Sequence, residues 1–200
     1  MKNPESKMSH PCRDRAVKLS LAALGAILLA PALPVRADPG QDNRAPDVPP
    51  TLEVPDGNKV SFHAYAVGVQ IYTATPSPTD PTQLVWTFTA PEAVLFDSDG
   101  NIVGIHYAYA GPTRPAWESE SGSLVVGARR ALATVDSSAI PWLLLQAVHT
   151  EPPGIFARTT YIQRVNTTGG LAPAMAPTQA GQEARVPYTA EYFFYREAQH

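Results

Sequence analysis

The chain has 200 residues, a formal net charge of -3 and one cysteine, but a removable leader at its start conceals a more acidic protein. The first 37 residues hold six basic residues, two acidic residues and the cysteine, so the remainder has nine basic and sixteen acidic residues, a net charge near -7. This acidity argues against nucleic acid and anionic lipid as partners, because clustered Lys and Arg bind both. The missing thiols exclude Cys-ligated zinc, iron–sulfur clusters and thiol catalysis.

Residues 1–37 are predicted to be a signal peptide. A polar, net positive segment is followed by the apolar run 19–32, and Val35-Arg36-Ala37 places small residues at the -3 and -1 positions of a cleavage site. The apolar run is too short for a membrane span, which needs roughly 20 residues. We therefore expect cleavage after Ala37, a secreted or periplasmic location, and no integral membrane segment in the mature protein.

Residues 38–55 are rich in proline and are predicted to form an extended lead-in. Residues 56–200 are predicted to form a single all-β domain, because short segments rich in Val, Ile, Tyr, Phe, Trp and Thr alternate with turn residues. The spacing favours an antiparallel sandwich or barrel of about 8–10 short strands with little helix. The candidate strands are residues 59–66, 68–73, 84–89, 93–96, 102–109, 123–127, 142–148, 155–165 and 188–195.

Three segments allow a second interpretation. Residues 128–135 are the best helix candidate, and residues 140–148 are predicted as a buried strand although Pro141 would suit the first position of a helix. The segment Asp97-Ser-Asp-Gly-Asn101 is predicted as a hairpin turn, because Asp and Gly tolerate a positive φ. Its alternative is a calcium loop, but the remaining ligand positions of an EF-hand are missing.

The patterns of common catalytic sites are absent: there is no G-x-S-x-G, H-E-x-x-H, P-loop or dinucleotide fingerprint. The histidines after residue 37 are His63, His106, His149 and His200. If His63, His106 and Glu118 converged, they would suit a metal ion or acid–base catalysis by an exported enzyme. Their spacing places no two of them on one local face, and a histidine between aromatic residues is more often structural. The leading hypothesis is therefore a binding or structural protein without a cofactor or bound metal.

Aromatic residues are the second candidate feature. Trp117 lies among Gly, Pro, Thr, Arg, Glu and Ser, and an exposed ring there could stack on a sugar. The alternative is that these aromatic residues are core material, as is ordinary in all-β proteins. The predicted partner is a small molecule or a glycan, bound in a cleft. The residues predicted to line the cleft are His63, Tyr65, His106, Tyr107, Trp117 and Glu118.

The order of short motifs from about Pro55 to Tyr195 resembles a secreted family called Domain of Unknown Function 3455. The resemblance implies export from bacteria or fungi and an unassigned activity. Some fungal relatives carry a malate dehydrogenase label, which the missing dinucleotide fingerprint does not support here. The motifs include Phe62-His-Ala-Tyr-Ala-Val-Gly-Val-Gln-Ile-Tyr72, Gly104-Ile-His-Tyr107, Trp117-Glu-Ser119, Ile140-Pro-Trp-Leu-Leu-Leu145, Thr160-Tyr-Ile-Gln-Arg-Val-Asn166, Gly169-Gly-Leu-Ala-Pro173 and Val186-Pro-Tyr-Thr-Ala-Glu-Tyr192.

The chain departs from the family pattern in two places. Members often have one cysteine after the Gln-Ile-Tyr segment and another after Gly-Gly-Leu-Ala-Pro, which implies a disulfide. Here these stretches read Thr73-Ala-Thr75 and Ala174-Met-Ala-Pro177, so both cysteines are missing. The segment between His106 and Trp117 is also longer than usual, with Thr113-Arg-Pro-Ala116 ahead of Trp117.

Overall fold

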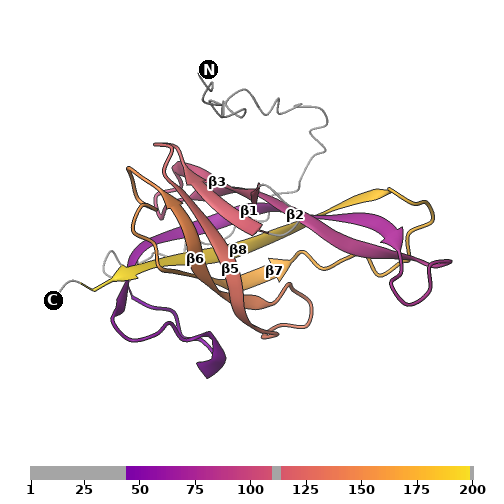
Figure 1. Cartoon of the computed structure of the whole chain (residues 1–200), viewed down its shortest axis with the longest axis horizontal. Coiled ribbons are helices and arrows are strands. Elements are labelled where there is room, and N and C mark those ends of the chain that lie inside the picture. The colour runs from indigo at the N-terminus through magenta and orange to yellow at the C-terminus, as the bar shows by residue number, and fades with distance from the viewer. Residues whose placement is uncertain (1–43, 110–113, 199–200) are drawn as a thin grey trace, which may run out of the picture. The chain divides into compact units, whose positions relative to one another are not determined.

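Eight antiparallel strands make up the fold, and each strand pairs with the next along the chain. Figure 1 shows the computed structural model, which describes residues 44–109 and 114–198. The last strand also pairs with the first, so the sheet closes into a barrel. This confirms the predicted all-β architecture, as a barrel rather than a sandwich. A 3₁₀ helix, η1 (Pro50–Leu52), precedes the strands, which are β1 (Asn58–Pro76), β2 (Leu84–Phe96), β3 (Ile102–Tyr109), β4 (Arg114–Ser119), β5 (Leu124–Ala133), β6 (Trp142–Glu151), β7 (Tyr161–Gly169) and β8 (Glu183–Glu197).

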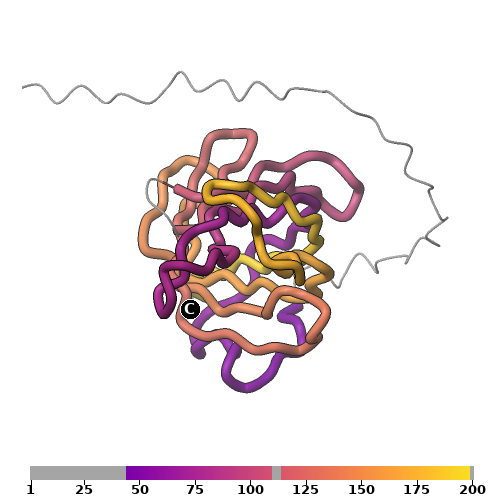
Figure 2. The backbone as a smooth tube through the Cα atoms, turned by 90° about the vertical axis from the view of Figure 1, so that its right-hand side faces the viewer, coloured from indigo at the N-terminus to yellow at the C-terminus, as the bar shows by residue number. Residues whose placement is uncertain are grey.

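The strands run round a common interior, as the second view shows (Figure 2). Successive side chains of a strand point to opposite faces, so each strand sends one set of residues inward. In β8, Tyr188, Tyr192 and Phe194 belong to the core inside the barrel. Phe193, between two of them, belongs to a separate outer cluster. An eight-stranded barrel is just wide enough for side chains to fill it or to hold one small ligand.

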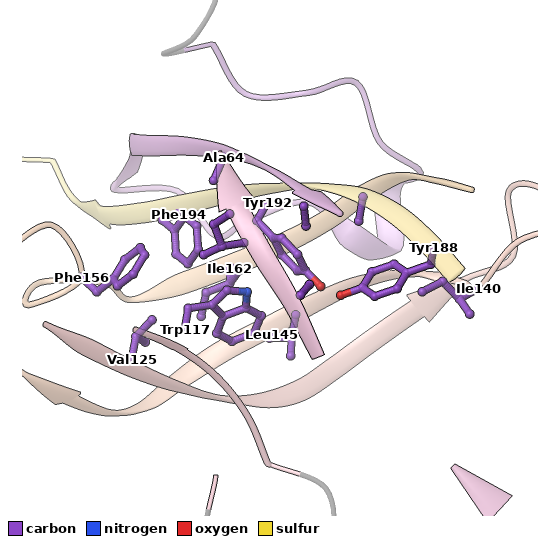
Figure 3. Packing of buried hydrophobic residues seen from close by; sticks show 14 residues of the cluster. Ala64, Trp117, Val125, Ile140, Leu145, Phe156, Ile162, Tyr188, Tyr192 and Phe194 are labelled. Atoms are coloured by element: carbon purple, nitrogen blue, oxygen red, sulfur yellow. The ribbon is translucent and has the colours of Figure 1, made fainter. Parts of the chain in front are cut away.

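The core is apolar toward the end of the barrel where β1 begins. Phe156, on the connection between β6 and β7, is fully buried there and lies 4.5 Å from the ring of Phe194. Phe62 packs against both rings, with centroid distances of 5.9 Å. Figure 3 shows Phe156 and Phe194 at one side of the core and Tyr188 at the other, with Trp117 and Tyr192 between them. Polar atoms therefore lie in the middle and toward the opposite end of the barrel.

Several strands are longer than predicted. The candidate strands 59–66 and 68–73 form one continuous strand, β1, and the candidates 84–89 and 93–96 form β2. Pro91 lies within β2, where it opposes Gln70 of β1. On the other side, β3 pairs with β2 only from Glu92 onward, so one edge of β2 has no β3 partner at Pro91. A residue without an N–H group is tolerated at such an edge.

Two predictions about secondary structure are wrong. Residues 128–135, predicted as a helix, form the second half of β5 and the turn after it, because pairing with β6 overrides a weak local helix preference. The prediction missed β4, whose Pro115 and turn-like neighbours disguise a strand. The hairpin at Asp97–Asn101 is confirmed, with Asp97 Oδ1 accepting the backbone N–H of Asn101 at 2.8 Å. No helix in the described part of the chain is long and apolar enough to cross a membrane.

The described part of the predicted lead-in, residues 44–55, packs against the barrel instead of extending away from it. Leu52 is completely buried, and Val48 and Val54 contact the outer cluster that includes Phe193. Gln163 Nε2 on β7 donates to the Leu52 carbonyl at 2.7 Å. Apart from η1, these residues have no regular secondary structure, so the segment packs against the barrel as an irregular chain. The predicted signal peptide (1–37), residues 38–43, Thr113 and His200 lie outside the described residues.

The two stretches that lack the family cysteines approach each other at the extended ends of β1, β2 and β8, on the right of Figure 1. Ala74 pairs with Trp86 of β2, and Trp86 Nε1 donates to the Met175 carbonyl at 2.9 Å. The Ala74 N–H also donates to the Gln182 carbonyl at 2.8 Å. These hydrogen bonds attach the loop between β7 and β8 to the barrel without a covalent link.

Candidate functional site

His106 and Trp117 face each other across the β3–β4 pair, and both point into the barrel. They are partners in the strand register, and their rings stack with centroids 4.5 Å apart and an interplanar angle of 9°. Trp117 is 1% exposed and His106 is 2% exposed. Of the two alternatives for Trp117, an exposed ring that stacks on a sugar and a core residue, the structure therefore bears out the second. Its ring packs instead against Tyr192 and Phe194 in the core.

Tyr107 and Glu118 lie on the outer face of the barrel. Each follows an inward-facing residue, so the alternation along the strand turns it outward. The Tyr107 hydroxyl donates to Glu118 Oε2 at 2.9 Å. Burial, together with this hydrogen bond and the negative carboxylate, raises the pKa of the Tyr107 phenol above its ordinary value. This hydrogen bond joins β3 to β4 on the outer face, and neither side chain reaches the barrel interior.

His63 and Tyr65 also lie on the outer face, on β1. His63 Nε2 is 3.0 Å from Glu191 Oε2, and its ring stacks on Phe193 with centroids 4.0 Å apart. The other oxygen of Glu191 accepts from Asn166 Nδ2 at 3.1 Å. Partial burial raises the pKa of the Glu191 carboxyl, but the hydrogen bonds from His63 and Asn166 outweigh it, and the pKa lies below its ordinary value.

The six predicted cleft residues therefore do not form one site. His106 and Trp117 face the interior, whereas His63 and Glu118 lie on the outer face of the barrel wall. The alternative in which His63, His106 and Glu118 converge on a metal ion or an acid–base centre does not fit this geometry, because His106 faces the interior and the other two face outward. Within residues 44–109 and 114–198, no group of three or more His, Cys, Asp or Glu side chains could hold a metal ion.

The barrel interior instead brings His106 and Trp117 together with polar residues that were not among the predicted cleft residues. Tyr188 and Tyr192 lie four residues apart on β8, roughly 13 Å along the strand, and their hydroxyl oxygens turn toward each other in Figure 3. Six side-chain atoms of the described residues are buried without a well-formed hydrogen bond, and four of them lie here: Gln70 Nε2, Trp117 Nε1, Tyr188 Oη and Tyr192 Oη. Looser polar contacts join Tyr188 to Tyr192 and Gln70, and Tyr192 to Arg164. We call the following residues the interior polar cluster: Gln70, His106, Trp117, Arg164, Tyr188 and Tyr192.

Arg164 brings a positive charge into this cluster. It is the register partner of Tyr192, and its charge acts on the phenols of Tyr188 and Tyr192 and on the imidazole of His106. Its Nε and Nη2 atoms donate to the Pro141 carbonyl at 3.2 Å and 2.8 Å. No carboxylate of the described residues forms an ion pair with Arg164.

The other titratable groups of the cluster are neutral. Burial lowers the pKa of His106 to about 3, against a smaller opposing effect of its hydrogen bond to the Ala116 carbonyl. His106 Nδ1 lies 2.8 Å from that carbonyl, which can only accept, so Nδ1 carries the proton and Nε2 is an acceptor. Burial also raises the pKa values of the Tyr188 and Tyr192 phenols. The cluster thus combines one cationic side chain with neutral hydrogen-bonding groups.

The buried His106 predicts a specific dependence of stability on pH. The unfolded chain takes up a proton at this histidine near pH 6.5, whereas the folded chain does so only near pH 3. The contribution of the neutral His106 to the free energy of unfolding is therefore fully present above pH 6.5. It falls by about 1.4 kcal/mol per pH unit as the pH is lowered from 6.5 toward 3. Urea unfolding at several pH values should show this slope in the native protein and a smaller one in His106→Asn. An NMR titration in which the His106 ring becomes protonated near pH 6.5 would contradict the prediction.

A comparison with known families covers the region that holds the cluster. A family model described as "Protein of unknown function (DUF3455)" matches residues 55–196. The chain belongs to this family. The DUF3455 match begins just before β1 and ends within β8, so it contains nearly all of the barrel and every residue of the interior polar cluster. No curated protein matches the chain.

Proposed function

We propose that this DUF3455 protein is a binding protein that holds a small polar molecule in the barrel interior, at the interior polar cluster. The observation that carries the proposal is the set of four buried polar atoms without a well-formed hydrogen bond, on Gln70, Trp117, Tyr188 and Tyr192. Leaving such a group unsatisfied costs about 1–3 kcal/mol. A bound molecule that hydrogen-bonds to several of these atoms would recover that free energy, which is the usual source of specificity in a buried site.

Figure 3 supports the same location, because the Tyr188 and Tyr192 hydroxyls and the Trp117 ring nitrogen all lie within the core rather than at its rim. The side chains come from β1, β3, β4, β7 and β8, so a ligand there would be held by rigid strands rather than by loops. The competing interpretation is that ordered water satisfies these atoms, as happens in many proteins.

A surface groove of about 600 Å³ is a weaker location for the site. It is lined by residues 55–58 and 159–161, among others, at the end of the barrel where β1 begins. Several polar atoms around it already have partners: Thr160 Oγ1 donates to Asn58 Oδ1 at 2.6 Å, and Asn58 Nδ2 donates to the Pro55 carbonyl at 2.9 Å. One unpartnered buried hydroxyl, that of Thr159, lies there, against four unpartnered atoms in the interior polar cluster.

The proposal includes export, on the basis of the leader at residues 1–37. An exported chain would start at Asp38 when isolated from the periplasm or the medium. The intact mass of the isolated protein tests this directly, and a full-length chain found only in the cytoplasm would refute it.

Release of a bound molecule from the purified protein tests the binding proposal. The protein is isolated from the cells that produce it and unfolded in organic solvent, and released small molecules are identified by mass spectrometry. We expect one molecule to be released from the native protein and to be missing from the double variant Tyr188→Phe/Tyr192→Phe, which keeps the rings but removes two unpartnered hydroxyls. That variant should be close to the native protein in stability when empty, because the two hydroxyls make only loose polar contacts with each other, Gln70 and Arg164.

Tyr195→Phe is the matched control, because its hydroxyl is already used by Gln163 Oε1 at 2.5 Å on the outer side of β7 and β8. This variant should lose stability and keep the bound molecule. If the native protein and the double variant release the same compounds, or if the native protein releases none, the proposal of interior binding fails.

A further inference from the structure

We infer that the molecule bound in the interior polar cluster carries a single carboxylate, and that Arg164 binds it. The inference rests on the proposed function and adds the chemical class of the ligand. Three features of the cluster lead to it: the unused N–H groups of Arg164, the lack of a carboxylate partner, and the donor character of the surrounding atoms.

One edge of the Arg164 guanidinium is available to bind a ligand. It carries five N–H donors in a fixed plane, and the Pro141 carbonyl accepts one from Nε and one from Nη2. Three remain, two on Nη1 and one on Nη2, and the guanidinium also makes a polar contact with the Tyr192 hydroxyl. The outer N–H groups of Nη1 and Nη2 point in parallel, which is the arrangement that binds both oxygens of a carboxylate. The contact with Pro141 holds the plane in place from the opposite edge and so presents this pair of donors.

The charges around Arg164 favour a monoanion. No described carboxylate pairs with it, and its neighbours Tyr188, Tyr192 and His106 are neutral. A positive charge partly removed from water is stabilised by one negative charge at hydrogen-bonding distance. A carboxylate supplies that charge and leaves the site neutral. A dianionic phosphate would leave a second, uncompensated negative charge among buried aromatic rings.

The unpartnered atoms near Arg164 also suit an acceptor-only group. Trp117 Nε1 and Gln70 Nε2 can only donate, and the neutral Tyr188 and Tyr192 hydroxyls each carry a proton to donate. An ionised carboxylate has two oxygens that accept several hydrogen bonds and no proton to give. An amide or an alcohol has only one acceptor oxygen, and its own donor would have to face the His106 Nε2 acceptor or a tyrosine oxygen.

Paired probes of the same shape and different charge test the inference. Acetate and benzoate are compared with acetamide, benzamide and phenyl phosphate by calorimetric titration and by tryptophan fluorescence, measured in a Trp86→Phe/Trp142→Phe background so that it reports on the buried Trp117. We expect binding of at least one carboxylate, and binding of its amide weaker by about 10- to 100-fold, the range expected for losing hydrogen bonds to a charged group. Arg164→Gln should reduce carboxylate binding to the level of the amide.

Two further variants separate this role from structural effects. Arg164→Lys keeps the charge but not the paired donors, so it should restore part of the carboxylate binding that Arg164→Gln loses. Arg185→Gln removes an exposed arginine that pairs with Glu92 on the outer surface, and carboxylate binding should be unchanged. Circular dichroism of each variant shows whether the barrel is folded.

The outcomes distinguish this inference from the proposed function. Equal binding of benzamide and benzoate, unaffected by Arg164→Gln, would overturn the carboxylate inference and leave interior binding intact. A preference for phenyl phosphate would replace the carboxylate by a phosphate. Carboxylate binding that disappears in Arg185→Gln would place it on the surface and overturn the inference. Failure of both carboxylates to bind would overturn it as well, while the release experiment would still decide the proposed function.

Discussion

Replacing Phe194 with alanine should lower the free energy of unfolding by about 3–5 kcal/mol, the range observed for removing a buried phenylalanine ring. Phe194 is completely buried and lies where the rings of Phe156, Phe62 and Trp117 meet. Interiors are packed as densely as organic crystals, so neighbouring rings fixed to separate strands cannot close the space that the variant leaves. Urea denaturation followed by circular dichroism measures the loss.

Met175→Ala is the control for this experiment. Met175 is 83% exposed, and only its backbone carbonyl is used, by Trp86. The substitution should change stability by less than about 0.5 kcal/mol. If Phe194→Ala lowers the free energy of unfolding by less than about 1.5 kcal/mol, the apolar end of the barrel is loosely packed, which would contradict the close ring contacts around Phe194.

Gly68→Ala is the second substitution with a large expected effect. A Cβ at this position of β1 would lie 2.1 Å from the Glu92 carbonyl oxygen and 2.4 Å from the Cβ of Ala93. The obstruction is mainly backbone of β2, so no side-chain rotation relieves it. We expect a loss of about 3 kcal/mol, at the upper end of the range for overpacking a core, together with a disturbed β1–β2 pairing.

Gly100→Asn is the matched glycine control. Gly100 has φ +83°, but nothing lies within 4 Å of its Cβ position, and asparagine tolerates this backbone conformation better than other residues. Its effect on the melting temperature should be small. A melting temperature of Gly68→Ala equal to that of the native protein would show that β1 and β2 are farther apart at this point than the structure has them.

The sequence was sufficient to predict the class of the fold because aromatic and β-branched residues concentrate in segments separated by turn residues. It was insufficient for strand length. Pro91 and Gly68 look like breaks, yet both lie inside long strands, since one is placed where β2 has no β3 partner and the other where two strands approach closely. The helix predicted at residues 128–135 was wrong for a related reason, because partner strands distant in sequence decide the conformation of such a segment.

Locating the candidate site required knowing which side chains face the barrel interior and which face outward. The strand register of the closed barrel decides this, and the sequence does not show it. His106 and Trp117 were singled out correctly as neighbours, since both were predicted to lie near one cleft. His63 was not separable from them by sequence, because nothing local marks which face of β1 turns inward. The alternation of Tyr188, Ala190 and Tyr192 along β8 was a detectable signal for an inward-facing set. Arg164 was hidden, because an arginine in a strand usually faces water.

The chain lacks the disulfide that the family resemblance implied, and the structure shows what holds this region instead. Ala74, at one of the positions near which a cysteine was expected, is 2% exposed and lies within β1, so it is not a loose loop. Its backbone N–H donates to Gln182, and its carbonyl accepts from Gly181 at 2.9 Å. Backbone hydrogen bonds and the Trp86–Met175 contact thus hold this region where a covalent link is absent.

The most direct test of interior binding is a crystal structure of the protein purified without added small molecules. We predict continuous electron density inside the barrel that is larger than a water molecule. It should contact Nη1 or Nη2 of Arg164 and lie within hydrogen-bonding distance of Trp117 Nε1 and the Tyr192 hydroxyl. Separate water peaks that satisfy the four unpartnered atoms, with no larger density in the interior, would contradict it.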